Sequence, residues 1–218
     1  MRYQGNRFEN GGQNVDSREA ILARIREAHS QREPEYGDLP RLYRQEGDLD
    51  VQDRIALLSE RLADYGCGVH RCGRDGIAAA IGAVLGQRGR TDMVASGDLP
   101  REWLPDTVRT GADLSYRELD RVGGVITRCS LAIAQTGTIV LEHDAHTPRA
   151  LTLIPDYHLC VLFAEQVVEL VPEAMRRMAG FAERPITTIS GPSATSDIEM
   201  TRVAGVHGPR TLDVLIVK

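Results

Sequence analysis

Apolar positions from residue 51 onward follow two patterns, the 3.6-residue period of a helix and the short apolar runs of buried strands. Two amphipathic helices are marked by apolar residues at helical spacing: Val51, Ile55, Leu58, Leu62 and Tyr65 in the first, and Ile77, Ile81, Val84 and Leu85 in the second. Strands are predicted over residues 67–72, 92–95, 151–154, 158–163, 185–189 and 211–217 and within 125–142, and a further helix over 164–178. Helices that alternate with strands predict an α/β domain with a mostly parallel sheet, whose ligands bind beyond the carboxyl ends of the strands.

The first 50 residues have a different character. Asp16 and Glu19 form a capping-box pattern that opens a helix over residues 17–31. Residues 32–50 hold prolines and glycines among mixed charges, which is typical of a surface linker, and a segment that reaches a partner would have the same composition. Two parts are therefore expected: an N-terminal helical arm of residues 1–50 and an α/β domain of residues 51–218.

Composition narrows the class of protein. A net charge of -5 and an aromatic content of 5% disfavour binding to nucleic acid or to anionic lipid, which depends on positive charge or exposed rings. No apolar run approaches the roughly 20 residues that span a bilayer. The first residues contain no apolar stretch of the kind found in a secretory signal. We therefore expect a cytoplasmic protein without a membrane span.

The spacing of the cysteines predicts that they hold no cofactor. They are widely spaced along the chain: Cys67, Cys72, Cys129 and Cys160. Iron–sulfur clusters need four thiolates, usually in tight runs, and a small disulfide framework needs a denser set. We expect a chain in a reducing compartment that holds no cluster of its own.

The segment after the predicted strand 185–189 is the first candidate binding site. Four hydroxyl residues, Ser190, Ser193, Thr195 and Ser196, flank Gly191 and Pro192 ahead of a capping-box pattern from Ser196 to Glu199. A strand that leads through such a turn into a helix N-terminus forms an anion site, because free amides and the helix dipole point outward together. Asp197 and Glu199 are the candidate acids there. A capped helix without a ligand is the alternative.

A second candidate lies in the turn Gln135-Thr136-Gly137-Thr138. Gly137 can adopt positive φ and let the backbone approach a ligand, although a plain hairpin turn explains the same residues. We expect this turn to meet the first one at the carboxyl edge of the sheet, so that Thr136, Gly137 and Thr138 lie near Gly191, Ser193, Thr195 and Asp197. His207, between glycines, is a candidate acid or base, or a ring that braces its own turn.

Metal sites and familiar catalytic motifs find little support. Residues 142–146 contain two histidines and two acids, but a metal needs further ligands, so an exposed polar loop is favoured. Residues 67–72 are better explained as a core strand. The sequence has no Gly-x-Ser-x-Gly elbow, no phosphate-binding loop of the Walker type and no Gly-x-Gly-x-x-Gly.

Three blocks of the sequence resemble the lactate-utilisation or LUD-domain family, in its short type that lacks iron–sulfur motifs. They are SGPSATSDIEMTRVAGVHGPRTLDVLIV (190–217), IAQTGTIVL (133–141) and LIPDYHLCV (153–161). The resemblance extends over 125–217 and, in layout only, over 51–124. It implies a Rossmann-like fold of the sugar-phosphate isomerase and CoA-transferase type. Where the family commonly has an acid before the Thr-Gly-Thr turn, this sequence has Gln135, so any carboxylate role at that position is in doubt here.

The resemblance leads to one hypothesis of function, and the residues lead to another. The family implies a subunit of an iron–sulfur-dependent system that oxidises L-lactate to pyruvate, in which a larger sister protein holds the cluster-binding cysteines. The alternative is a stand-alone small-molecule enzyme that binds an anionic substrate at the two turns and moves protons with Asp197, Glu199 or His207.

Overall fold

The computed structural model describes residues 17–30, 42–111, 113–181, 183–192, 194–195, 203–204 and 208–218. Contacts divide the chain into two units, residues 1–43 and 44–218, and each is described by itself. In the first unit, the predicted helix is confirmed as α1 (Ser17–Ser30). Its side chains Ile21 and Ile25 are exposed.

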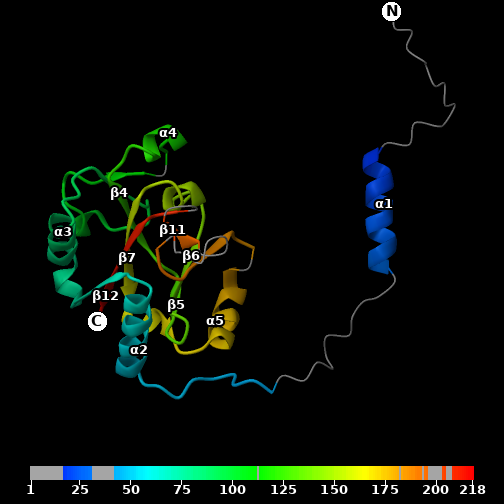
Figure 1. The fold of residues 1–218 in the computed structure, drawn as a ribbon, viewed down its shortest axis with the longest axis horizontal. Helices are drawn as coiled ribbons and strands as arrows, with labels where there is room; N and C mark the ends of the chain where they lie inside the picture. The colour runs from blue at the N-terminus through cyan, green and yellow to red at the C-terminus, as the bar shows by residue number, and fades with distance from the viewer. Residues whose placement is uncertain are drawn as a thin grey trace, which may run out of the picture. The chain divides into compact units, whose positions relative to one another are not determined.

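The second unit is built on a parallel sheet of six strands (Figure 1). In sheet order the strands are β1 (Gly68–Cys72), β12 (Thr211–Val217), β7 (Tyr157–Phe163), β4 (Gly124–Arg128), β2 (Met93–Ala95) and β3 (Arg109–Thr110). Every neighbouring pair is parallel. The α/β prediction with a mostly parallel sheet is therefore confirmed.

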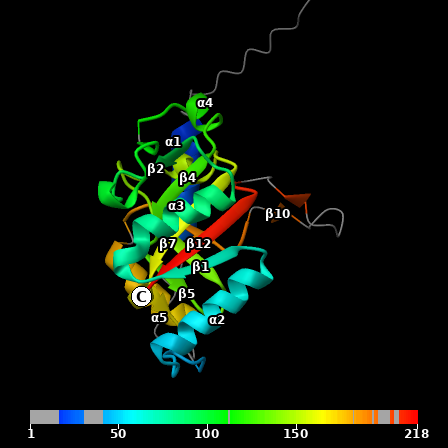
Figure 2. The ribbon, with the colours of Figure 1, turned by 90° about the vertical axis from the view of Figure 1, so that its left-hand side faces the viewer.

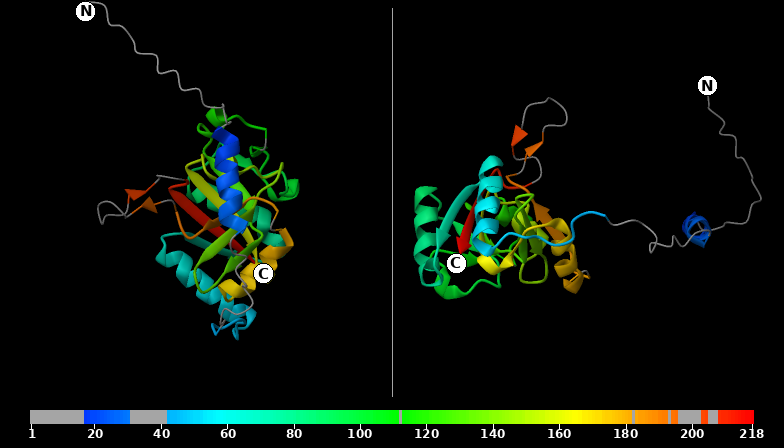
Figure 3. Two further views of the ribbon diagram at one scale, coloured as in Figure 1. Left: turned by 90° about the vertical axis from the view of Figure 1, so that its right-hand side faces the viewer. Right: turned by 90° about the horizontal axis from the view of Figure 1, so that it is seen from below.

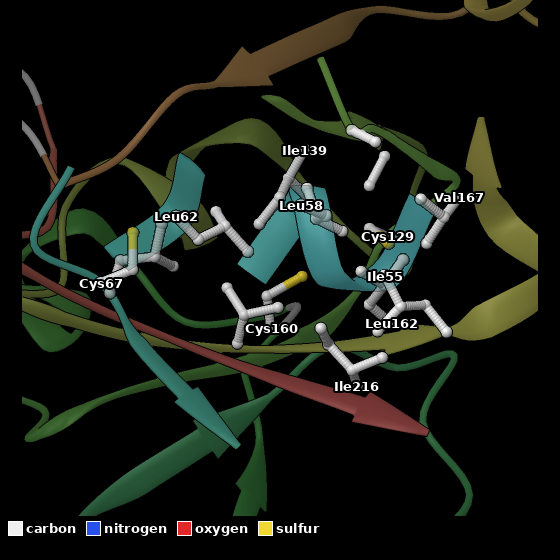
Figure 4. Packing of buried hydrophobic residues seen from close by; sticks show 14 of the residues in the cluster. Ile55, Leu58, Leu62, Cys67, Cys129, Ile139, Cys160, Leu162, Val167 and Ile216 are labelled. Carbon is white, nitrogen blue, oxygen red and sulfur yellow. The ribbon is translucent and has the colours of Figure 1, made fainter. Parts of the chain in front are cut away.

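Helices cover both faces of this sheet. α3 (Ile77–Gln87) packs on one face, where Ile81 and Val84 contact Leu159 and Leu215 in one apolar cluster. α2 (Val51–Asp64) packs on the other face, where Leu58 and Leu62 belong to a cluster with alternate residues of β7 and β12 (Figures 2 and 4). Successive side chains of a strand point to opposite faces, so each central strand supplies both clusters.

A second sheet of four strands lies on the α2 side and was not expected from the sequence (Figure 3). Its strands, in order, are β8 (Val167–Val168), β5 (Leu131–Ile133), β6 (Thr138–Glu142) and β9 (Ile186–Ile189). α5 (Val171–Met178) covers its outer face through Ala174, which packs with Leu131 and Val140. The second sheet therefore lies between α5 and the core of the first sheet.

The remaining elements are short. They are α4 (Tyr116–Leu119), the 3-10 helices Arg74–Gly76, Arg101–Trp103, Arg149–Thr152, Ala164–Gln166 and Ala179–Phe181, and a pair of strands, β10 (Ala194–Thr195) and β11 (Val203–Ala204). No helix among the described residues combines the length and the apolar character needed to cross a membrane.

Three predicted elements need correction. Residues 151–154 are no strand, because a 3-10 helix begins after Pro148 and runs over Arg149–Thr152. The helix predicted over 164–178 begins only at Val171, because Val167–Val168 pairs with β5 instead. The Glu173 carboxylate accepts hydrogen bonds from the amides of Glu169 and Leu170 and so fixes that start.

The third correction concerns the helix expected to begin at the capping-box pattern of residues 196–199. Val203–Ala204 is the strand β11, paired antiparallel with β10, so that helix does not extend over these two residues. The capping-box residues Ser196–Glu199 lie outside the described residues. The strand before them, β9, is confirmed, although its side chains are half-buried or exposed rather than buried.

Candidate functional site

The two turns singled out in the sequence lie side by side. Thr138 begins β6, and Ser190 follows the end of the antiparallel neighbour β9. The Thr138 Oγ1 lies 2.8 Å from the Ser190 Oγ and 2.7 Å from the Thr136 Oγ1. A chain of three hydroxyl groups therefore joins segments that are 52 residues apart in the sequence.

The glycines of both turns pack under the end of α2. Gly137 has a φ of +62° and Gly191 a φ of +91°, values that favour glycine. A methyl group on Gly137 would lie 2.8 Å from the Cβ of Arg61, and one on Gly191 would lie 2.7 Å from the Cβ of Tyr65. Gly137 closes the β5–β6 hairpin, in which Ile133 faces Thr138. The hairpin is therefore confirmed for this turn, and both glycines pack against the end of α2, while a role of the turn in binding a ligand stays a prediction.

A cavity of about 230 Å³ opens beside the turn that begins at Ser190. Its described lining combines apolar side chains with hydroxyl groups, glycines, prolines and one imidazole, and comprises Thr152, Leu153, His158, Thr187, Thr188, Ile189, Ser190, Gly191, Pro192, Gly208, Pro209 and Leu212. His158 and Leu212 are each the second residue of their strands, β7 and β12. The cavity therefore lies at the amino ends of the central strands, and the expected position at their carboxyl edge is wrong for these turns.

His158 is the titratable group in the described wall of this cavity. Its side chain is 1% exposed, and the Nε2 lies 2.8 Å from the Thr127 Oγ1. Burial lowers the pKa of His158 to about 4, so the imidazole is neutral at pH 7. The Nδ1 has no hydrogen-bond partner among the residues that the structure describes. A buried ring nitrogen without a partner is a position where a ligand or a water completes the hydrogen bonding.

The chemistry open to this cavity follows from its lining. Its described side chains carry no charge at neutral pH, so an anionic ligand would depend on hydroxyl and backbone N–H donors. His158 was not among the residues predicted from the sequence. The signal for it is one polar residue inside the apolar strand Tyr157–Phe163, because a buried polar side chain in such a run needs a specific partner.

The structure describes only some of the other predicted site residues. Gln135 is exposed beside the hairpin, and Thr195 lies in β10, opposite Val203. Ser193, Ser196, Asp197, Glu199 and His207 lie outside the described residues, so their roles stay predictions. Gly208 and Pro209, which follow His207, line the cavity.

The histidine-rich segment 142–146 has a structural role for one of its rings. His143 is 3% exposed, and its ring nitrogens lie 3.0 Å from the Thr147 carbonyl oxygen and 2.8 Å from the Thr187 Oγ1. The expectation of an exposed polar loop is therefore wrong for His143 and right for His146. Within the described part of the chain, no three His, Cys, Asp or Glu side chains are grouped to hold a metal ion.

Comparison with known proteins places the chain in a family. The family model described as LUD domain matches residues 98–217. A protein of Deinococcus radiodurans named Lactate utilization protein C is 43% identical over 164 residues, which is 72% of this chain and 76% of that protein. A protein of the same name from Shouchella clausii is 31% identical over 123 residues, 54% of this chain and 53% of that protein. An uncharacterised protein of Escherichia coli is 34% identical over 119 residues, 52% of this chain and 51% of that protein.

A solved structure agrees with these relatives. The crystal structure of a DUF162 family protein from Deinococcus radiodurans matches with a TM-score of 0.68 and 35% sequence identity, over 78% of this chain and 100% of that chain. Sequence and structure together show that the chain belongs to the LUD-domain family.

Proposed function

We propose that this chain is a cytoplasmic subunit, without redox centres, of an iron–sulfur-dependent system that oxidises L-lactate to pyruvate. The observation that carries the proposal is the 43% identity to a protein named Lactate utilization protein C, over 76% of that protein. In this proposal sister subunits bind the chain, and one of them carries the clusters. Residues 1–43 form the arm that meets these partners.

The cysteines are consistent with that division of labour. No disulfide joins any two of them, and Cys67, Cys129 and Cys160 are buried. The neighbouring Cys160 thiol and burial raise the pKa of Cys129 well above its ordinary value, so this sulfur stays a thiol at neutral pH. Thiolates are the ligands that clusters need. Electron transfer is therefore assigned to the sister subunits.

Co-expression tests the association. Tagged full-length chain is expected to retain its sister subunits through affinity purification and gel filtration, and a strain that lacks the gene is expected to lose growth on L-lactate. Removal of residues 1–43 is expected to weaken retention, while the remaining unit of residues 44–218 is expected to keep its thermal unfolding transition because its contacts are internal to it. Absence of any association, together with normal growth of the deletion strain on lactate, would refute the proposal.

A stand-alone small-molecule enzyme of the isomerase or CoA-transferase type is the second candidate. The observation that favours it is the 230 Å³ cavity with His158 and Ser190 in its wall. A ligand that binds the native state raises the melting temperature. Sugar phosphates, acyl-CoA and small carboxylates are therefore the compounds to screen, with Ser193→Ala and Asp197→Asn as variants. A screen without any shift would reject this candidate.

A further inference from the structure

The order of the parallel strands creates a crevice away from the cavity described above. The chain passes from β2 to the edge strand β3 and then returns to β4 on the other side of β2. Later strands, β7 and β12, continue in that second direction. Parallel sheets bind ligands beyond the carboxyl ends of the strands at such a reversal. In this chain that position is the gap between the residues that follow β2 and β4.

A polar cavity of about 350 Å³ occupies this position. Asp98 comes from the loop after β2, Arg128 is the last residue of β4, and Ser130 follows it. Glu142, Thr147 and Gln166 complete the polar lining. The volume is in the range that holds a small metabolite.

Arg128 is the uncompensated cation of this cavity. Its guanidinium carbon lies 5.8 Å from the centre of the Phe163 ring. Its Nε is shielded from solvent and has no hydrogen-bond acceptor in the described part of the chain. No ion pair of Arg128 is found among the described residues. A buried donor without an acceptor is costly, and the planar fork of a guanidinium matches a carboxylate.

The two acids that line the cavity differ in whether a cation pairs with them. Glu142 already pairs with Arg184. Asp98 accepts hydrogen bonds from the hydroxyls of Ser96 at 2.5 Å and Thr147 at 3.4 Å, but no cation pairs with it in the described structure. Asp98 and Arg128 therefore line one cavity as opposite charges that do not pair with each other. A ligand that accepts from Arg128 and donates to Asp98 would satisfy both.

From these contacts we infer that the cavity between β2 and β4 binds a small hydroxycarboxylate. The ligand's carboxylate accepts hydrogen bonds from Arg128, and its hydroxyl group donates to Asp98. The choice of L-lactate as the probe rests on the proposed function. The site requires only this chain, so it can be tested apart from any complex, and failure to find partner subunits would leave it standing.

Calorimetric titration of the full chain tests the inference, with L-lactate as the probe. Propionate lacks the hydroxyl group, and lactamide lacks the charge. Arg128→Gln is expected to weaken L-lactate binding about tenfold or more, because one charge-assisted pair is lost. Asp98→Asn is expected to reduce the preference for L-lactate over propionate. Arg74→Gln is the matched control, since Arg74 lies 4.9 Å from the same Phe163 ring but already pairs with Glu165.

Each result of the titration either supports the proposed site or overturns it. Saturable L-lactate binding that Arg128→Gln weakens and Arg74→Gln leaves intact supports the site. No saturable binding by the wild type, or equal affinity in wild type and Arg128→Gln, overturns it. Equal affinity for propionate overturns the role of Asp98. Thermal unfolding checks that each variant is folded, and Arg128→Lys, which keeps the charge without the planar fork, gives the same test should the glutamine variant not fold.

Discussion

At the scale of single residues, Asp213 in β12 and His158 in β7 are polar side chains buried inside otherwise apolar strands. Asp213 in β12 is 0% exposed and receives a bidentate pair from Arg88, with distances of 2.8 Å and 2.7 Å, and a hydrogen bond from the Tyr157 hydroxyl at 2.8 Å. Burial raises the pKa of Asp213, but the hydrogen bonds from Arg88 and Tyr157 outweigh it, so the net shift is downward. The carboxylate is therefore charged at neutral pH and depends on Arg88.

Replacing Arg88 tests that dependence. Arg88→Met is expected to lower the free energy of unfolding by about 2–4 kcal/mol, because a buried charge loses its partner. Arg109→Met is the matched control, since Arg109 pairs with Asp92 at 3.6 Å on the surface and its loss is expected to cost less than about 1 kcal/mol. Urea unfolding at pH 7 measures both. Equal effects of the two substitutions would contradict the account of Asp213.

His158 gives a pH dependence whose sign can be worked out. The folded-state pKa is lowered to about 4, while an unfolded histidine titrates near 6.5. Between these values the unfolded chain binds a proton that the folded chain does not, so the contribution to stability is full above pH 6.5 and is lost as the pH falls toward 4. The loss over this window is roughly 3 kcal/mol.

Unfolding free energies from pH 7 to pH 4 check this expectation. The difference between wild type and His158→Gln is expected to change across the window by that amount, because glutamine does not titrate. His146→Gln, which removes an exposed imidazole, is the control for general effects of charge. A difference between wild type and His158→Gln that is independent of pH would show that His158 is not a buried neutral ring.

At the scale of elements, the periodicity of the apolar residues predicts the helices and strands that depend on residues close in sequence. The helices α2 and α3 and the strand β12 appear where the apolar spacing predicts them, and α1 begins where the capping-box pattern predicts it. The second sheet was missed, because β5 pairs with β8 and β6 with β9, and short apolar runs do not reveal such distant partners. For the same reason the sequence pattern favours a helix at Val167–Val168, whereas pairing with β5 makes it a strand.

The sequence likewise predicts only part of the candidate site. Hydroxyl and glycine residues indicated both turns, and Thr138 and Ser190 are hydrogen-bonded at 2.8 Å. The packing of Gly137 and Gly191 against the end of α2 was not predictable, because sequence spacing does not show which helix covers a turn. Nor does spacing show that β9 ends beside the amino ends of β7 and β12.

Substitution of Gly137 tests the packing of the hairpin. Gly137→Ala is expected to destabilise the fold by about 1–3 kcal/mol, because alanine is strained at a φ of +62° and its methyl group would lie 2.8 Å from the Cβ of Arg61. Gly82→Ala in α3 is the control, since nothing lies within 4 Å of its added methyl group. It is expected to stabilise the protein by about 0.5–1 kcal/mol. Thermal unfolding of both variants measures these changes in stability. A Gly137→Ala variant as stable as the wild type would contradict the packing described.

At the scale of the whole molecule, one buried acid fixes the start of the second unit. The Glu169 side chain is 6% exposed, pairs with Arg44 and accepts a hydrogen bond from the Leu49 amide at 2.7 Å. Gly47 packs so closely that an added methyl group would overlap the Glu169 side chain. Residues 44–49 are therefore held to the α/β unit and are not a free linker.

Release of this segment is measurable by limited proteolysis. Glu169→Ala is expected to increase the rate of cleavage within residues 44–49 several-fold, because the contacts from Arg44 and Leu49 are lost. Glu165→Ala, which removes an exposed carboxylate paired with Arg74, is the control. An unchanged rate in Glu169→Ala would show that other contacts hold the segment.

The most direct test of the proposed role is L-lactate oxidation by purified components. The sister subunits, reconstituted with their clusters, are assayed for lactate-dependent reduction of an electron acceptor, with and without this chain. We predict that oxidation requires the chain, and that the chain alone has no such activity. Equal rates with and without it would contradict the account.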